Sequence, residues 1–164
     1  MLEYIFIAFL VMICIQFIYY LFVFGRYSFS SIKKQNLTNS NQPVSIIICA
    51  KNEADNLNYN LPLFLNQNYP AFELILINDC SSDNTLDVLE NFKKSSSIPI
   101  KIVNVEANEQ FWGSKKYALT LGIKAATHNH LLFSDADCKP KSANWISEMV
   151  SHFSDTKQIV LGYG

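Results

Sequence analysis

The sequence predicts an α/β fold with a doubly wound, mainly parallel sheet, preceded by one transmembrane helix. Short runs of β-branched and large aliphatic residues alternate with stretches of helical spacing, which is typical of parallel strands joined by crossover helices. Ahead of them, residues 4–24 form an apolar run without a charged residue. We therefore expect a membrane helix at residues 1–25, a polar juxtamembrane linker at 26–42 and the α/β domain at 43–164.

The N-terminal run is long enough to cross a membrane, because about 20 helical residues span the hydrocarbon core. A cleaved signal peptide is the alternative. However, Glu3 precedes the run, and Arg26 and Tyr27 follow it where a small-residue cleavage site would be needed. Arg26, Lys33 and Lys34 come just after the run, so the positive-inside rule predicts a single-pass N-terminal anchor in the cell membrane with a cytoplasmic domain.

Charge and cysteine content exclude some classes of protein. Lys and Arg total 13 against 14 Asp and Glu, so the chain lacks the basic footprint that nucleic-acid binding needs. The 4 cysteines are too far apart for a zinc ribbon or a C-x-x-C redox pair. Free thiols fit a reducing compartment.

The predicted domain begins at Pro43 with a succession of strands and helices. Apolar runs predict strands at residues 44–50, 73–78, 100–105 and 130–134, and the segment QIVLGYG (158–164) predicts one more. Apolar residues at helical spacing predict helices at 54–67, 83–94, 114–126 and after Ser142.

Proline and serine residues mark features within these helices. Pro62 should kink or restart the first helix, because proline removes a backbone hydrogen bond. Ser81 with Ser82, Ser114 and Ser142 are the candidate helix caps.

Polar loops follow several of the predicted strands. AKNEAD follows the first strand, DCSSDNT the second and DADCKP the fourth. In an open parallel sheet, ligands bind outside the carboxyl ends of the strands, near the point where the strand order reverses. The acids of these loops should therefore meet at one edge of the sheet.

Asp135 and Asp137 are the candidate metal ligands. Mg²⁺ or Mn²⁺ takes one or two protein carboxylates and completes its shell with water and phosphate oxygens, so two acids flanking one residue suit a cation-bound diphosphate. A carboxylate at Asp79 can accept a hydrogen bond from the imide of a base, and Lys115 at a helix start can meet a diphosphate. The alternative for Asp135 and Asp137 is that they are solvated or cap the helix after Ser142.

The segments PVSIIICAKNEADNL, ELILINDCSSDNT, GSKKYALTLGI and LLFSDADC, in this order, resemble the nucleotide-sugar-binding half of family 2 glycosyltransferases with the GT-A fold. The resemblance covers residues 43–164. It implies a GT-A-like (Rossmann-like) sheet and an enzyme that moves a sugar from a UDP or GDP sugar to an acceptor hydroxyl with Mg²⁺ or Mn²⁺.

The resemblance also implies which residues bind the donor and the metal. Glu53 and Asp79 would hold the base and ribose, with the backbone around Ala50 packing on the base. Lys115 would lie beside the diphosphate. The remaining roles fall to the two acids of the DAD motif: Asp135 would lie near the ribose and the metal, and Asp137 would ligate the metal.

The same resemblance implies that the general base and the acceptor-binding half follow Gly164. Our alternative function is a non-catalytic, nucleotide-diphosphate-binding membrane fragment that lacks the general base. A nucleotidyltransferase is disfavoured, because no Gly-rich phosphate loop follows the first strand.

Structural interpretations remain open for individual residues. Glu53 can be a first-turn helix acid, Asp79 an Asx-turn former and Lys115 a solvated surface charge. Phe111 and Trp112 are expected to pack rather than to line the donor site.

Histidine and cysteine side chains complete the set of candidates. His128 and His130 have no ligand spacing with Asp135, so we assign them no metal. The cysteines at the strand ends, Cys49, Cys80 and Cys138, are expected near the nucleotide in packing roles.

Overall fold

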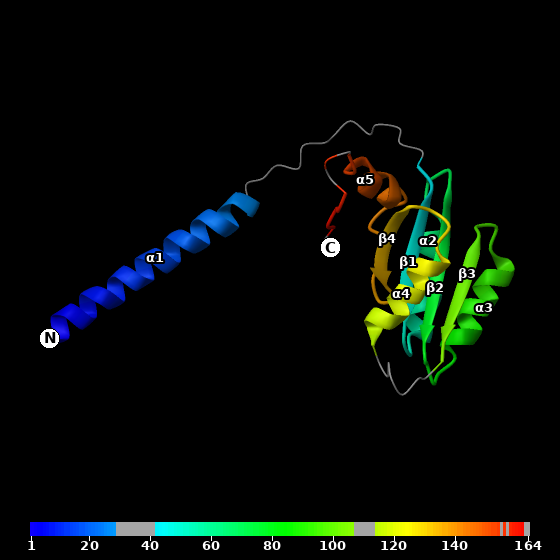
Figure 1. The fold of residues 1–164 in the computed structure, drawn as a ribbon, viewed down its shortest axis with the longest axis horizontal. Coiled ribbons are helices and arrows are strands. Elements are labelled where there is room, and N and C mark those ends of the chain that lie inside the picture. Colours follow the sequence, from blue (N-terminus) through cyan, green and yellow to red (C-terminus); the bar gives the residue numbers. More distant parts are fainter. Residues whose placement is uncertain (29–41, 107–113, 155, 157, 163–164) are drawn as a thin grey trace. The chain divides into compact units, whose positions relative to one another are not determined.

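The structure is a computed structural model that describes residues 1–28, 42–106, 114–154, 156 and 158–162. The chain divides into two compact units, Met1–Lys34 and Gln35–Gly164. Figure 1 shows the helix of the first unit and the sheet of the second. Each unit is described by itself.

The first unit contains the long helix α1 (Leu2–Ser28). Its segment Leu2–Gly25 has a mean hydropathy of 2.5. Among the described residues, α1 is the only helix that is long enough and apolar enough to cross a membrane. The structure therefore confirms an apolar helix at the predicted place, and its crossing of a membrane stays a prediction. Residues 29–41 of the expected linker, with Lys33 and Lys34, lie outside the described residues.

The second unit is built on a four-stranded sheet with the order β3-β2-β1-β4, in which every pairing is parallel. The strands lie where the apolar runs predicted them: β1 (Val44–Ala50), β2 (Phe72–Asp79), β3 (Ile100–Val105) and β4 (His130–Asp135). The chain moves outward from β1 to β3 and then returns to the other side of β1 to form β4. The strand order therefore reverses between β1 and β4, which confirms the predicted doubly wound sheet.

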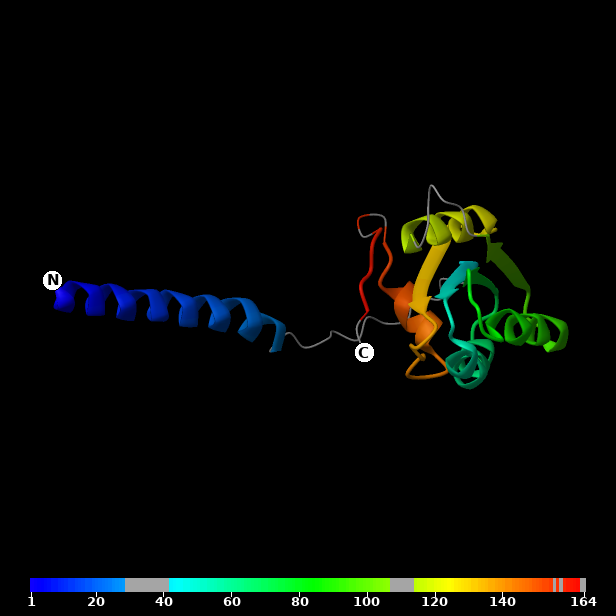
Figure 2. The ribbon, with the colours of Figure 1, turned by 90° about the horizontal axis from the view of Figure 1, so that it is seen from below.

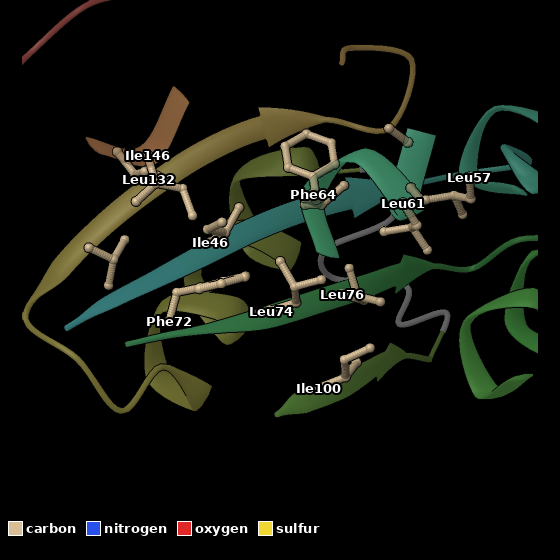
Figure 3. Close-up of a cluster of buried hydrophobic side chains, with 14 of the residues drawn as sticks. Ile46, Leu57, Leu61, Phe64, Phe72, Leu74, Leu76, Ile100, Leu132 and Ile146 are labelled. Carbon is tan, nitrogen blue, oxygen red and sulfur yellow. The ribbon is translucent and has the colours of Figure 1, made fainter. Parts of the chain in front are cut away.

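Helices cover both faces of the sheet, as Figure 2 shows. Helices α2 (Ala54–Leu65), α3 (Thr85–Ser95) and α5 (Trp145–Ser151) contribute to the apolar cluster on one face, and α4 (Lys115–Ala125) to the cluster on the other. In the larger cluster, Ile46 and Leu74 of the sheet pack with Leu61 and Phe64 of α2 (Figure 3). Each fully buried side chain of this kind contributes about 1.5 to 3 kcal/mol, so this packing holds α2 against the strands.

Gly122 lets α4 lie close to the sheet. A Cβ at this position would come 2.4 Å from Ile77 Cδ1 and 3.1 Å from Ile47 Cγ2. The absence of a side chain at Gly122 therefore lets this part of α4 pack directly against Ile77 and Ile47 of the sheet.

Two predicted helices differ from the structure in detail. Helix α2 continues through Pro62 and ends at Leu65, so the helix does not restart at the proline, and the alternative of a kink there stays a prediction. Helix α5 begins at Trp145 after Asn144, so the expectation that Ser142 caps it is wrong. Instead, Ser142 Oγ accepts a hydrogen bond from the Asn144 N–H at 3.2 Å in the turn before the helix.

Of the serine caps predicted for α3 and α4, the structure confirms the one at α4. Ser114 caps α4 as expected, because its side chain accepts from the Tyr117 N–H. The prediction that Ser81 and Ser82 cap α3 is wrong, since the helix begins only at Thr85. There Asp83 Oδ1 accepts from the Thr85 N–H at 3.0 Å.

The expected strand at residues 158–164 is also wrong for the part that the structure describes. Residues 158–162 have no strand conformation, and Ile159 and Leu161 are largely exposed. An apolar run becomes a strand only when a neighbouring strand satisfies its backbone groups. The described pairings of β4 involve β1 alone, so residues 158–162 have no such partner.

Candidate functional site

The carboxyl ends of the strands form one edge of the sheet, at which three polar loops meet (Figure 1). Cys49 of β1 pairs with Asp135 of β4, and Ala50 pairs with Asn78 of β2. The strands therefore end nearly level. The reversal of strand order places the ends of β1 and β4 at the position where open α/β sheets bind ligands.

The loops after β1 and β2 are joined by hydrogen bonds. Asn52 has a positive φ of 56°, which asparagine tolerates better than most residues. Its N–H donates to Ser81 Oγ at 3.0 Å, and its Oδ1 accepts from the Ser82 N–H at 2.8 Å. The Glu53 N–H donates to Thr85 Oγ1 at 2.9 Å. The serines expected to cap α3 thus fasten one loop to the other.

The residues expected at the base and ribose lie in and beside this joined pair of loops. Ala50 is buried, with its side chain in the core, so only its backbone can face a ligand. Glu53 Oε2 accepts from Asn56 Nδ2 at 2.6 Å. Asp79 ends β2 with 8% of its surface exposed, and within the described residues its carboxylate has no hydrogen-bond or ion-pair partner. That carboxylate retains its capacity to accept hydrogen bonds.

The turn after β4 directs both acids of the DAD motif to solvent. The Cys138 N–H donates to the Asp135 carbonyl at 3.1 Å, which closes the turn. Ala136 is buried in the core, and its carbonyl accepts from Asn60 Nδ2 of α2 at 2.9 Å. Because the middle residue points inward, the flanking Asp135 and Asp137 side chains are exposed.

The exposed acids of this turn are arranged as a candidate metal site. Single ligand atoms of Asp135, Asp137 and Cys138 all lie within 4.8 Å of one another. Burial and the neighbouring Asp137 carboxylate raise the pKa of the Cys138 thiol. Two carboxylates with open surroundings fit Mg²⁺ or Mn²⁺, which prefer oxygen ligands and keep several waters. Sequence reasoning missed Cys138 as a member of this cluster, although it directly follows Asp137.

Lys115 and Asp135 lie together, as expected of two groups at one site. Lys115 Nζ is 2.6 Å from Asp135 Oδ1, and both side chains are more than half exposed. The hydrogen bond from this ammonium to Asp135 raises the pKa of Lys115. Lys115 is the first residue of α4, so its positive charge adds to that of the helix N-terminus beside the acidic turn.

The pKa of the Cys49 thiol indicates that acids from different loops lie close together. Its pKa is raised to about 11, mainly by burial and also by the negative charges of Asp79 and Asp135, while Lys115 acts in the opposite direction. Asp79 and Asp135 are therefore near the same thiol. A thiol with so high a pKa is a poor nucleophile at neutral pH, which agrees with the expected packing role.

Some candidates make no described contact with the acidic turn. No described contact joins Glu53 to Asp135 or Asp137, and Phe111 and Trp112 lie outside the described residues. Within the described part of the chain, the candidate metal cluster contains no histidine.

Comparisons with known proteins agree with this architecture. The family model described as Glycosyl transferase family 2 matches residues 45–163. A poly-beta-1,6-N-acetyl-D-glucosamine synthase of Staphylococcus epidermidis is 32% identical over 120 residues, which cover 73% of this chain and 28% of that protein. The chain thus spans less than a third of the length of this curated relative.

Solved structures show the same fold. A mannosyltransferase from Pyrobaculum calidifontis, in complex with GDP-Man and Mn²⁺, aligns with a TM-score of 0.77 at 20% identity. The alignment covers 95% of this chain and 45% of the mannosyltransferase chain. S. aureus TarS 1-349 in complex with UDP-GlcNAc aligns with a TM-score of 0.50 at 26% identity, and the alignment covers 58% of this chain and 27% of the TarS chain.

Proposed function

Because the chain belongs to glycosyl transferase family 2, we propose that it contains the donor-binding part of an enzyme that transfers a sugar from a nucleoside-diphosphate sugar to an acceptor hydroxyl. The observation that carries the proposal is the exposed turn at the end of β4, where Asp135 and Asp137 flank a buried alanine beside Lys115. This turn lies where the strand order reverses, at the edge that open α/β sheets use for ligands.

The donor is a UDP or GDP sugar. A relative at 26% identity is known in complex with UDP-GlcNAc, and the S. epidermidis relative is named as a poly-N-acetylglucosamine synthase. UDP-GlcNAc is therefore the first donor to test. Asp79, whose carboxylate has no partner among the described residues, would accept from the base, and Glu53 would lie beside the ribose.

The diphosphate is bound by opposite charges at the β4 turn. Asp137 and Asp135 would hold Mg²⁺ or Mn²⁺ through their carboxylates, and Lys115 would contact a phosphate oxygen. A bound divalent cation supplies Lewis-acid stabilisation of the charge that develops on the leaving diphosphate. The ammonium of Lys115 and the N-terminus of α4 add positive charge at the same place.

Helix α1 would anchor the protein in the cell membrane as a single span, with residues 26–42 as a linker and the domain from residue 43 in the cytoplasm. Its length and apolar composition support this assignment.

The test replaces one proposed metal ligand without changing its size. In the full chain in detergent, Asp137→Asn should weaken Mn²⁺-dependent UDP-GlcNAc binding by more than about 10-fold, since even groups that only support a metal ligand change affinity by that much. Calorimetry measures the affinity, and thermal unfolding checks that the fold is intact. Glu90→Gln in α3 removes a carboxylate outside the site and is the control. Unchanged affinity in Asp137→Asn would contradict the proposal.

Nucleotide preference separates this function from that of a nucleotidyltransferase. A ligand at 100 times its dissociation constant stabilises the folded state by about 2.7 kcal/mol. UDP or GDP with Mn²⁺ should raise the unfolding temperature more than ATP with Mn²⁺ does. Stabilisation by ATP alone would count against a sugar-nucleotide donor.

A further inference from the structure

Asn60 is a polar residue on the buried face of α2. The buried residues of this helix are Leu57, Asn60, Leu61 and Phe64, and Asn60 is 5% exposed. A buried amide without a partner costs about 1 to 3 kcal/mol, so a leucine would suit this face better unless the amide has a role. Asn60 Nδ2 donates to the Ala136 carbonyl at 2.9 Å, across 76 residues of sequence.

The Ala136 carbonyl belongs to the turn that carries the proposed metal ligands. The Ala136 side chain is 3% exposed and packs in the same apolar cluster as α2. The residue is therefore held twice, at its side chain by apolar packing and at its carbonyl by Asn60. The Ala136 carbonyl belongs to the peptide that joins Ala136 to Asp137, so a rotation of this peptide would redirect the Asp137 carboxylate and disturb the turn that the Asp135 carbonyl closes.

We propose that Asn60 is a positioning residue for the cation site, which acts by holding the Ala136 carbonyl and thereby sets the directions of the Asp135 and Asp137 carboxylates. The inference rests on the proposed function, because it takes cation binding by these acids as its starting point. Groups that orient metal ligands without touching the metal change affinity by about 10- to 100-fold. Loss of the Asn60 bond should therefore weaken cation binding, although Asn60 lies in the core.

Gln67 is a matched control, because it is a second buried amide that holds the chain after β4. It is 8% exposed, its Nε2 donates to the Ser142 carbonyl at 2.9 Å, and its Oε1 accepts from the Ile146 N–H at 3.2 Å. These bonds hold the segment beyond the acidic turn. Loss of Gln67 therefore destabilises the neighbouring part of the fold without releasing the Ala136 carbonyl.

The experiment measures Mn²⁺ binding to the full chain in detergent, with and without UDP, by electron paramagnetic resonance of the free ion. Asn60→Leu and Gln67→Leu should both lower the unfolding temperature. Below both transitions, Asn60→Leu should bind Mn²⁺ about 10-fold or more weakly than the wild-type chain, while Gln67→Leu should keep the wild-type affinity. If Asn60→Leu prevents folding, Asn60→Ser takes its place in the experiment. The short serine side chain cannot reach the Ala136 carbonyl, so the same loss of Mn²⁺ affinity is expected.

The outcomes separate this inference from the proposed function. Wild-type Mn²⁺ affinity in a folded Asn60 variant would overturn the positioning role. An equal loss in the Asn60 and Gln67 variants would also overturn it, because such a loss would follow from destabilisation alone. Failure of the wild-type chain to bind Mn²⁺, even with UDP, would instead overturn the proposed metal site, and that result needs no variant.

Discussion

The two ends of the sheet each carry a lysine–carboxylate ion pair, and the pairs differ in burial. At the carboxyl end, Lys115 Nζ lies 2.6 Å from Asp135 Oδ1, with 59% and 53% of the side chains exposed. At the amino end, Lys101 Nζ lies 3.2 Å from Glu73 Oε2, and only 5% of the Glu73 side chain is exposed. The exposed carboxylate can exchange its partner for a ligand, whereas the buried one is committed to the fold.

The partners of Glu73 show what that commitment involves. Its carboxylate accepts from Ser45 Oγ at 2.7 Å, from the Thr127 N–H at 2.6 Å and from Thr127 Oγ1 at 3.1 Å. Together with Lys101, these bonds join β1, β2, β3 and the connection that leads into β4. The number of partners and the degree of burial, rather than the charges, distinguish a structural acid from a candidate binding acid.

The largest expected effect is on stability at the amino end. Glu73→Ala leaves the buried Ser45 hydroxyl and the two Thr127 donors without their acceptor, and should lower the free energy of unfolding by about 3 kcal/mol. Urea unfolding followed by circular dichroism measures the change. Asp135→Ala is the comparison at the other end, where we expect a change below about 0.5 kcal/mol. Equal losses in the two variants would remove the distinction between the ends.

The next effect is the acid sensitivity of the same network. Burial by itself raises the pKa of Glu73, but hydrogen bonds from Ser45, Thr127 and Lys101 outweigh it and leave the pKa below its usual value of 4.5. The charged form is thus stabilised by folding. This contribution is complete above pH 4.5 and is lost as the pH falls through the lowered pKa of the folded state.

Glu73→Gln should therefore lose less stability on acidification than the wild-type chain. Urea midpoints at neutral pH and at about pH 3 measure the difference. Parallel declines in the two proteins would mean that other groups determine the acid sensitivity.

The smallest expected effect is on stability at the carboxyl end. Lys115→Met should change the free energy of unfolding by less than about 0.5 kcal/mol, because exposed ion pairs contribute little. The same substitution should weaken UDP binding in the presence of Mn²⁺, since it removes a positive charge from the proposed diphosphate site. A large loss of stability with unchanged UDP binding would make Lys115 a structural residue like Lys101.

Local patterns in the sequence predicted the fold and the edge at which the candidate site lies. A parallel strand buried on both faces needs a nearly continuous apolar run, so β1 and β2 could be recognised from their own residues. Asp79 and Asp135 are candidates because each stands at the end of an apolar run. Their proposed roles in binding stay predictions, which the variants above test.

The helix starts were less predictable, because serine serves several purposes. Ser114 caps α4, but Ser81 and Ser82 bind Asn52, which precedes them by 29 and 30 residues. A serine before a helix satisfies the nearest unpaired backbone group or one brought by another loop, and the local sequence does not distinguish these cases.

The sequence by itself determined that apolar strands end in acidic loops, because burial patterns and turn residues act over a few neighbouring positions. Only the tertiary structure decided how those acids are held. The Asn60 bond to Ala136 spans 76 residues and the Thr127 bond to Glu73 spans 54, and neither partner carries a local sign of the other. Hydrogen bonds at such separations exist only after the sheet has formed, which is why the exposed turn and the buried network became distinguishable only in the folded chain.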